Sequence, residues 1–424
     1  MRIVADRGTQ DQLRCHRRAT PSGWLDGQGR TALVKVSHAV ERLGQSQRAK
    51  SLTRPGPDVI SLASGDPSFD TPDHIREAAI SAIRAGQTHY SAPIGEADLR
   101  RAIAAQLSEL GGGAFRAEDI LISSGANSAI YAAMTAYLDP GDEVLIHDPC
   151  YSLYADVALA IGAIPVFVPW TADLRLDIDA LERAVTPRTR MVVVNNPVNP
   201  TGIVFTADEM RAVADFVCRH DLLLLADEAY DHLVFDGRDM VSAGSFEGLA
   251  DRLLLINTCS KTFAMTGWRV GYLAARAGLV RAPSLVHRTS CGFVNTIAQR
   301  AAVTAYTVRK NAPARMAAEY AARRDLMCEM VNAMPGLRCA KPEGAFYVFV
   351  RVDANLTSEA LTEHCLSHGV AVRSGTEFGP RGEGFIRLTF AGESANFEPG
   401  LRRLETAMRS LPVTDRSQAE SRSG

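Results

Sequence analysis

A single lysine stands among hydroxyl side chains in the stretch NTCSKTFAMTGWRVGY, residues 257–272. Lys261 follows Thr258 and Ser260, and Arg269 comes eight residues after it. A partly desolvated lysine amine forms Schiff bases with carbonyl compounds. Hydroxyl groups and a guanidinium fork are suited to binding phosphate oxygens. The ordinary alternative is a lysine whose amine reaches water.

A carboxylate ends a strongly apolar run. Asp227 follows LLLLA at 222–226 and begins the sequence Asp-Glu-Ala-Tyr, which ends at Tyr230. An unpaired buried charge is costly, and no arginine or lysine stands within a few residues of Asp227. A protonated ring nitrogen on a ligand is one candidate partner, and an N-cap role for the aspartate is the structural alternative.

A possible anion site follows another apolar run. Ser124, Gly125, Ala126 and Asn127 open a helical pattern. Unpaired backbone N–H groups at a helix start attract an anion such as phosphate. An ordinary helix start without a ligand fits the same four residues.

Two further loops contain groups that suit a ligand. The stretch NPVNPTG, residues 196–202, has two Asn-Pro steps that make a rigid turn and restrict the amide side chain of Asn199. Tyr151 also follows an apolar run, where its ring can stack on a flat heterocycle or fill the core.

All of these groups come directly after apolar runs. In an open α/β sheet, ligands bind beyond the carboxyl ends of the strands. An amine, a carboxylate, a phosphate cradle and a stacking aromatic ring at one edge suit a phosphorylated pyridine aldehyde. The sequence therefore predicts pyridoxal 5′-phosphate as cofactor.

A sheet must bring these groups together. Short apolar runs separated by helical patterns predict an α/β fold, with a mainly parallel sheet covered by helices on both faces. The predicted strands are residues 119–123, 143–148, 164–169, 191–196, 222–227, 253–258 and 269–275.

The pattern changes after a long helical stretch at about 311–333. Strands predicted at 344–352, 370–375 and 384–391 alternate with helices and indicate a smaller α+β domain. The predicted organisation is a disordered extension 1–34, an N-terminal segment 35–72 packing with the small domain, a large domain 73–310, a small domain 311–411 and a disordered tail 412–424.

Composition excludes several classes of protein. The chain has 424 residues and a net charge of −2, which argues against a nucleic-acid-binding surface. No apolar run approaches the ~18 residues of a membrane span. The first 34 residues lack the apolar segment of a secretory signal. The eight cysteines form no CxxC pair and no metal-ligand cluster, which predicts reduced thiols in a cytoplasmic protein.

Several segments resemble the signature segments of the class I and II (fold-type I) pyridoxal-phosphate-dependent aminotransferases. They are NPVNPTG, DEAY, SKTFAMTGWRVGY, LASGDPSFDTP and GEGFIRLTFA, and the resemblance covers about residues 35–411. It implies a large domain with a mainly parallel seven-stranded sheet and a smaller α+β domain. It also implies ping-pong transfer of an amino group between an L-amino acid and a 2-oxo acid, through a Schiff base at Lys261.

The resemblance implies roles for individual residues. Lys261 holds the cofactor and moves the proton of the substrate's Cα, and Asp227 keeps the cofactor's ring nitrogen protonated. Asn199 and Tyr230 bind the ring 3′-oxygen, and Tyr151 stacks on the ring. The residues implied to hold the phosphate are Gly125, Ala126, Asn127, Thr258, Ser260 and Arg269.

Other residues are implied to act on the substrate or between subunits. Arg387 in FIRLTFA binds the substrate's α-carboxylate, which the backbone of Gly65 and the side chain of Asn199 also approach. Tyr90 matches a family tyrosine that reaches the phosphate of the partner subunit. The resemblance therefore implies a homodimer with shared active sites.

The motifs leave other reactions open. A carbon–sulfur β-lyase or a ring-closing synthase on the same scaffold needs the same Lys261 and Asp227. A non-catalytic aminotransferase-like regulator would need a DNA-binding module, and the first 34 residues show no helix-turn-helix pattern.

Substrate preference is the least constrained property. Phe69, Phe346 and Tyr347 indicate a pocket for apolar or aromatic side chains, and Arg373 is a candidate for binding a second carboxylate. The segment Arg373-Ser374-Gly375 departs from the family, which often has Pro-Gly there.

Overall fold

The computed structural model describes residues 35–44, 46, 56–276, 278–308 and 312–411. The predicted extension 1–34 and the predicted tail 412–424 lie outside these ranges, as do residues 45 and 47–55 of the predicted N-terminal segment. Among the described residues, no helix has the length and apolarity needed to cross a membrane.

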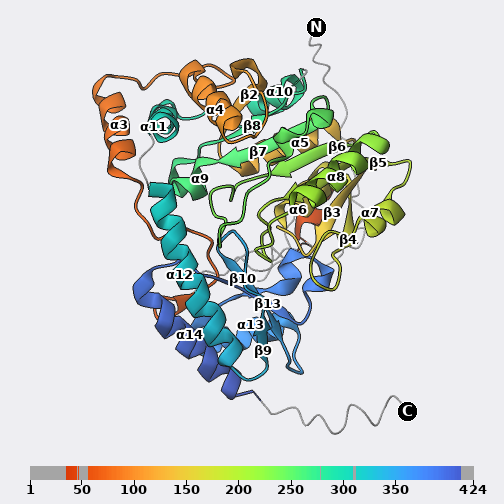
Figure 1. Ribbon diagram of the computed structural model, residues 1–424, viewed down its shortest axis with the longest axis vertical. Coiled ribbons are helices and arrows are strands. Elements are labelled where there is room, and N and C mark those ends of the chain that lie inside the picture. The colour runs from red at the N-terminus through yellow and green to blue at the C-terminus, as the bar shows by residue number, and fades with distance from the viewer. Residues whose placement is uncertain (1–34, 45, 47–55, 277, 309–311, 412–424) are drawn as a thin grey trace, which may run out of the picture.

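A seven-stranded sheet forms the centre of the molecule (Figure 1). In spatial order its strands are β2 (Ile120–Ser123), β8 (Gly271–Ala274), β7 (Leu253–Thr258), β6 (Leu223–Asp227), β5 (Thr189–Asn195), β3 (Glu143–Asp148) and β4 (Ile164–Pro169). All neighbours are parallel except β8, which runs antiparallel to both β2 and β7. The predicted seven-stranded, mainly parallel sheet is confirmed.

Helices cover both faces of this sheet, which explains why its strands are apolar on both sides. Successive strand residues alternate between two cores: Leu224 packs into one and Leu225 into the other. The helices of this region are α3 (Asp73–Arg84), α4 (Ala97–Glu109), α5 (Ala126–Tyr137), α6 (Leu153–Ile161), α7 (Ile178–Ala184), α8 (Ala207–Arg219), α9 (Cys259–Thr262), α10 (Arg281–Ser290) and α11 (Thr296–Thr307).

A smaller antiparallel sheet lies beside the large one, in the lower half of Figure 1. Its order is β12 (Arg373–Ser374), β13 (Phe385–Thr389), β10 (Tyr347–Val352) and β9 (Leu337–Cys339). The helices α12 (Ala312–Ala333), α13 (Ser358–Ser367) and α14 (Ser394–Arg409) accompany it. A separate core, which includes Tyr320, Val350 and Leu404, holds these elements together.

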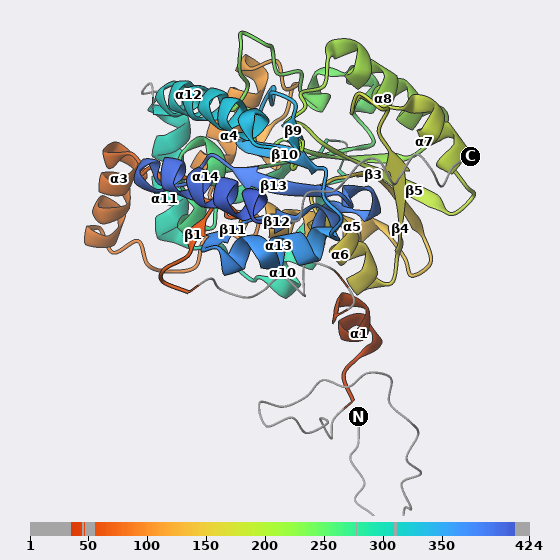
Figure 2. The same cartoon turned by 90° about the horizontal axis from the view of Figure 1, so that it is seen from below.

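The N-terminal segment divides between the two regions. β1 (Ile60–Ser61) pairs in parallel with β11 (Val370–Ala371), next to the small sheet. By contrast, α1 (His38–Gly44) lies against α6 of the large region (Figure 2), where the Arg42 Nε donates to the carbonyl of Leu159 at 2.6 Å. α1 thus contacts the large region, whereas β1 pairs beside the small sheet. The predicted packing of the segment 35–72 with the small domain and the domain boundaries stay predictions.

One predicted strand forms two separate strands in the structure. The run 370–375 contains β11, which pairs with β1, and β12, which pairs with β13. The chain changes sheet at the buried residue Val372 between them. A continuous apolar pattern cannot show this, because the residues on both sides of the change are equally extended.

Candidate active site

A cavity of about 560 Å³ lies at the carboxyl ends of β5, β6 and β7, facing the small sheet. Most of the residues that the sequence analysis selected line it. They are Gly65, Ala126, Asn127, Tyr151, Asn199, Asp227, Tyr230, Thr258, Ser260, Lys261, Arg269 and Arg387. The fold thus brings together groups that are far apart in the chain.

Lys261 lies in α9, directly after β7. Its Nζ donates a hydrogen bond to the Gly65 carbonyl at 2.6 Å and lies 5.4 Å from the centroid of the Phe346 ring. Burial lowers the pKa of this amine to about 8, and the charge of Arg387 acts in the same direction. A larger fraction of the amine is therefore neutral near physiological pH, and only a neutral amine can act as a nucleophile or a base.

Asp227 is the last residue of β6 and is only 4% exposed. Its Oδ2 accepts a hydrogen bond from the Tyr154 hydroxyl at 2.7 Å, and its Oδ1 accepts one from the Ala229 N–H at 3.1 Å. Burial raises the pKa of the Asp227 carboxyl to about 6, although these two bonds act against the shift. The carboxyl therefore exchanges a proton near neutral pH.

The start of α5 is open for an anion. Its N-cap is Gly125 at φ +79°, and no described side chain caps the helix. A Cβ at this position would lie 2.4 Å from Nη2 of Arg269, so the close approach of the guanidinium requires glycine. Arg269 itself has φ +56°, and its Nη1 donates to the Thr266 carbonyl at 2.9 Å. Free N–H groups beside a fixed cation suit a phosphate.

The hydroxyls of Thr258 and Ser260 lie at the end of β7, beside the helix start. Their oxygens are 2.9 Å apart, and both residues line the cavity. Thr258 Oγ1 also donates to the Val270 carbonyl at 3.0 Å, which fixes its side chain. The Ser260 hydroxyl can donate to the predicted phosphate site, and the Thr258 hydroxyl, fixed by Val270, holds it in place.

Arg387 enters the cavity from β13 of the small sheet. Its Nη1 donates to Oδ1 of Asn199 at 3.0 Å, and its Nη2 donates to the Ala63 carbonyl at 2.6 Å. The guanidinium carbon lies 4.1 Å from the centroid of the Tyr347 ring and 4.8 Å from that of Phe378. The group is held in one orientation, as recognition of a carboxylate requires.

Two tyrosines that line the cavity contact each other through their hydroxyl groups. The hydroxyls of Tyr230 and Tyr347 are 3.1 Å apart and buried. Tyr347 also limits the neighbouring backbone, since a Cβ on Gly65 would lie 2.0 Å from its hydroxyl oxygen. Tyr151 lines another wall and contacts the Tyr154 ring edge to face, with centroids 5.7 Å apart.

Tyr90 lies apart from these residues. Its side chain is 85% exposed and does not line the cavity. Its ring stacks on Phe293 with centroids 4.6 Å apart. Within one copy of the chain, Tyr90 is therefore a surface residue.

Sequence reasoning missed two residues that support the site. Tyr154 projects from α6 to Asp227, and no motif marked it. Asn195 accepts from the Asn199 N–H at 2.8 Å and donates to the Asp227 carbonyl at 3.0 Å, so it connects β5, β6 and the NPVNPTG loop. Its place directly before that loop was the available signal.

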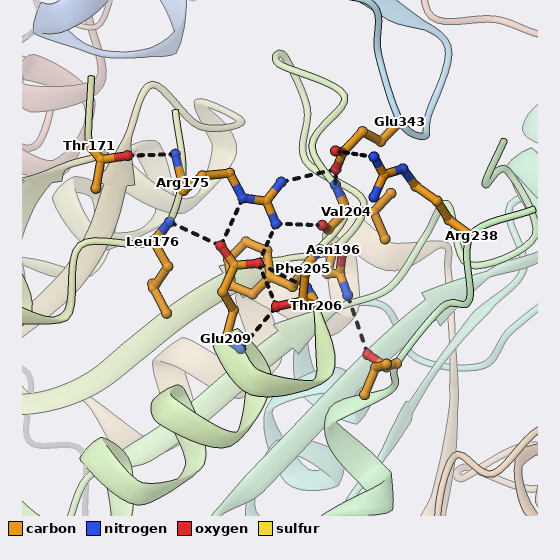
Figure 3. A network of polar contacts seen from close by, with 11 residues as sticks. Thr171, Arg175, Leu176, Asn196, Val204, Phe205, Thr206, Glu209, Arg238 and Glu343 are labelled. Atoms are coloured by element: carbon orange, nitrogen blue, oxygen red, sulfur yellow. Dashed lines mark hydrogen bonds and ion pairs between the residues drawn. The ribbon is translucent and has the colours of Figure 1, made fainter. Parts of the chain in front are cut away.

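An ion-pair network contacts the backbone next to the NPVNPTG loop (Figure 3). Arg175 donates to Glu209, in the first turn of α8, and to Glu343, with Nη1 and Oε2 3.0 Å apart. The same guanidinium donates to the carbonyl of Val204, just after the loop, at 3.0 Å. The loop, α8 and the segment that enters β10 are therefore tied to one side chain.

These features fit pyridoxal phosphate. A buried amine with a lowered pKa, a buried carboxyl, an uncapped helix start beside a cation and several aromatic rings line one cavity. The cofactor has a carbonyl, a ring nitrogen, a phosphate and a flat ring, which match these four kinds of group.

Comparison with known proteins supports this interpretation. A model of the family described as "Aminotransferase class I and II" matches residues 57–404. The chain is 38% identical over 364 residues to the "Aspartate aminotransferase" of Pyrococcus abyssi, covering 84% of this chain and 93% of that protein. It is 38% identical over 358 residues to the "Aromatic-amino-acid aminotransferase 2" of Thermococcus litoralis, covering 83% and 92%.

A solved structure agrees with the family match. The aromatic aminotransferase from Pyrococcus horikoshii superposes with a TM-score of 0.81 at 37% sequence identity, covering 88% of this chain and 98% of that chain. The sequence motifs, the fold and the relatives thus point to one family. The chain belongs to the class I and II aminotransferases, enzymes that use pyridoxal phosphate to transfer amino groups.

Proposed function

We propose that the cavity around Lys261 is the active site of this aminotransferase, and that Lys261, Asp227 and Arg387 carry the reaction. The supporting observation is that an amine, a buried carboxyl and a guanidinium group line one cavity. Amino-group transfer needs these groups as a base, as a partner for the cofactor ring and as an anchor for a carboxylate.

Arg387 binds the α-carboxylate of the amino acid in this proposal. Asn199 and Ala63 fix two of its nitrogens, and its buried Nε has no hydrogen-bond partner among the described residues. An unsatisfied buried donor is costly, and a carboxylate is the acceptor that matches a guanidinium best. Gly65 leaves room for that carboxylate because it has no side chain.

Lys261 acts as the base. Bound at this site, pyridoxal phosphate supplies a carbonyl for the substrate's amine and an electron-withdrawing ring. The Lys261 amine, with a pKa of about 8, takes the proton from the substrate's Cα and later returns a proton. Asp227 shares a proton with the ring nitrogen, and the bonds from Tyr154 and Ala229 hold its carboxyl in place.

The other cavity residues are proposed to hold the cofactor. Tyr151 packs on the ring, and Asn199 and Tyr230 bind the ring 3′-oxygen. The proposed phosphate site consists of Gly125, Ala126, Asn127, Thr258, Ser260 and Arg269. Its support is the uncapped start of α5 beside a fixed guanidinium.

We further propose a homodimer in which Tyr90 reaches the phosphate site of the partner subunit. An aromatic ring that is 85% exposed and lies outside its own cavity supports a role toward a second copy. A cytoplasmic location is proposed as well, because the described cysteines are free thiols.

The substrates are proposed to be an L-amino acid and a 2-oxo acid, with aspartate and aromatic amino acids as the first candidates. Relatives named for each are 38% identical to this chain. Both of these relatives, and the solved structure from Pyrococcus horikoshii, are named as aminotransferases, which favours transamination over elimination or ring closure.

The test is a half-reaction with the full chain loaded with pyridoxal phosphate. Each amino acid of a panel is added alone, and the absorbance of the bound cofactor is followed; a 2-oxo acid is then added to reverse the change. We expect reversible conversion by aspartate, glutamate or phenylalanine. If the only turnover is release of pyruvate and ammonia from a cysteine S-conjugate, the enzyme is a lyase and the proposal fails.

A further inference from the structure

The helix that carries Lys261 is very short. α9 has only four residues, so a single helical turn presents the amine to the cavity. An isolated turn is unstable, because several backbone dihedrals must be fixed for each hydrogen bond gained. Contacts from outside α9 must therefore hold this turn in place.

Asp231 makes two such contacts, one on each side of Lys261. Its Oδ2 accepts a hydrogen bond at 2.9 Å from Nδ2 of Asn257, which lies near the end of β7. Its Oδ1 accepts one at 3.2 Å from the hydroxyl of Thr262, directly after the lysine. Asn257 and Thr262 are both buried. One carboxylate thus joins the two ends of the segment that carries the amine.

Asn257 connects Asp231 to the start of α9. Its Oδ1 accepts a hydrogen bond from the Thr258 N–H at 2.6 Å. The Thr258 hydroxyl in turn accepts one from the Ser260 N–H at 3.2 Å, which caps the helix. The position of the turn therefore depends on Asp231 through a continuous series of hydrogen bonds.

Asp231 belongs to the same chain turn as two proposed cofactor contacts. It directly follows Tyr230, and its N–H donates to the Glu228 carbonyl at 3.1 Å. Asp227 and Tyr230 line the cavity, whereas Asp231 does not. Asp231 therefore supports the lysine segment from outside the cavity, without a place for it to touch a bound cofactor or substrate.

The donors around Asp231 require a carboxylate. Its Oδ1 also accepts a hydrogen bond from the His232 N–H at 2.8 Å. An asparagine would turn its NH2 group toward that N–H or toward the NH2 group of Asn257, so that donor faces donor. Asn257 cannot turn over, because its oxygen would leave the Thr258 N–H. A group that only accepts satisfies all the donors at once.

We propose that Asp231 is a positioning residue for Lys261, which fixes the turn that carries the amine and keeps the amine directed into the cavity. This inference rests on the proposed role of Lys261. Asp231 has no part in proton transfer. The proposed phosphate contacts at the start of α5 and at Arg269 do not involve it, so binding of the cofactor's ring and phosphate should persist without it.

The test separates covalent attachment from binding of the ring and phosphate. Stopped-flow absorbance measures the rate at which the full-length apoprotein captures pyridoxal phosphate, at about pH 9, where the Lys261 amine with its pKa of about 8 is mainly neutral. Calorimetry measures the affinity for pyridoxamine 5′-phosphate, which has the same ring and phosphate but no carbonyl. In Asp231→Asn the capture rate should fall about 10- to 100-fold, as for other small misplacements of a reacting group. The affinity for pyridoxamine 5′-phosphate should stay within about twofold of the wild-type value.

Thr262→Val is the second variant, because it keeps the shape of the side chain and removes only the hydroxyl that donates to Asp231. Its capture rate should fall less, by about three- to tenfold. Asp251→Asn is the matched control. It changes a surface aspartate just before β7, whose Oδ1 lies 3.1 Å from Nε of Arg252, and it should capture the cofactor at the wild-type rate.

The outcomes distinguish this inference from the proposed function. If the capture rate and the affinity for pyridoxamine 5′-phosphate fall to the same degree, Asp231 supports the whole site and the inference is overturned. If Asp231→Asn and Thr262→Val both capture the cofactor at the wild-type rate, the lysine segment needs no such support and the inference fails alone. A wild-type chain that captures no pyridoxal phosphate would reject the proposed function itself.

Discussion

The hydroxyl of Tyr154 donates a hydrogen bond to Oδ2 of Asp227 over 2.7 Å, and both groups are buried. The bond lowers the pKa of the carboxyl, against the larger effect of burial. In Tyr154→Phe the pKa of Asp227 should therefore rise further. We expect the single-turnover rate to fall about tenfold and the acid limb of its pH profile to move to higher pH.

The control for this variant is Tyr137→Phe, which removes a hydroxyl that donates to the Leu279 carbonyl at 2.6 Å outside the cavity. That variant should keep the wild-type pH profile. A Tyr154→Phe enzyme with an unaltered profile would show that this tyrosine only fills space.

Lys261→Ala should abolish covalent attachment of the cofactor. Borohydride treatment fixes cofactor to the wild-type chain, and mass spectrometry should find no fixed cofactor on the variant. Without the base, transfer should slow at least about a thousandfold. Lys341→Ala is the matched control, because that amine lies at the surface, 3.1 Å from Asp325. Cofactor fixed to Lys261→Ala would contradict the assignment.

The capture of pyridoxal phosphate by the apoprotein should depend on pH. Burial lowers the pKa of Lys261 from 10.5 to about 8, so the amine is protonated below that pH and neutral above it. Only the neutral amine attacks a carbonyl. The capture rate, measured by stopped-flow absorbance, should rise with pH and level off above about pH 8. A rate that keeps rising to about pH 10 would indicate an ordinary, solvated lysine.

Gly65→Ala should disturb the cavity through Tyr347. The added Cβ would lie 2.0 Å from the hydroxyl oxygen and 2.9 Å from the ring carbon that carries it. The tyrosine must move, and its contact with Tyr230 is lost. We expect activity to fall by about 10- to 100-fold, as for other small misplacements of catalytic groups.

The companion experiment is the double variant Gly65→Ala with Tyr347→Phe. Removing the hydroxyl relieves the shortest contact, so part of the lost activity should return. Gly248→Ala is the control, because its nearest neighbour would be 3.8 Å away. If the double variant is worse than either single one, the clash with the hydroxyl is not the cause.

Much of the large sheet could be predicted from the sequence. The ranges of β3, β4 and β7 match the predicted runs, because strands covered on both faces are continuous apolar segments. The antiparallel direction of β8 could not be predicted, since a buried strand has the same composition in either direction. Its direction follows from pairing with β2 and β7, which are distant in the chain.

The site residues in loops that directly follow strands could be predicted from the sequence. The site residues on helices, and the contacts between residues far apart in the chain, could not. Tyr154 reaches Asp227 across 73 positions, and only the packing of α6 on the sheet brings them together. Such contacts depend on tertiary packing, which no local pattern encodes.

The shared guanidinium of Arg175 has a consequence for evolution and for redesign. Glu209 belongs to α8, after the NPVNPTG loop, and Glu343 belongs to the segment before β10. Glu209 offers two carboxylate oxygens and Glu343 one to the same Arg175 side chain. A substitution that removes the carboxylate of only one of these two acids leaves the positive charge of Arg175 partly unpaired. A directed-evolution library that diversifies the entrance to β10 will therefore retain variants that keep Glu343 or that change Arg175 at the same time.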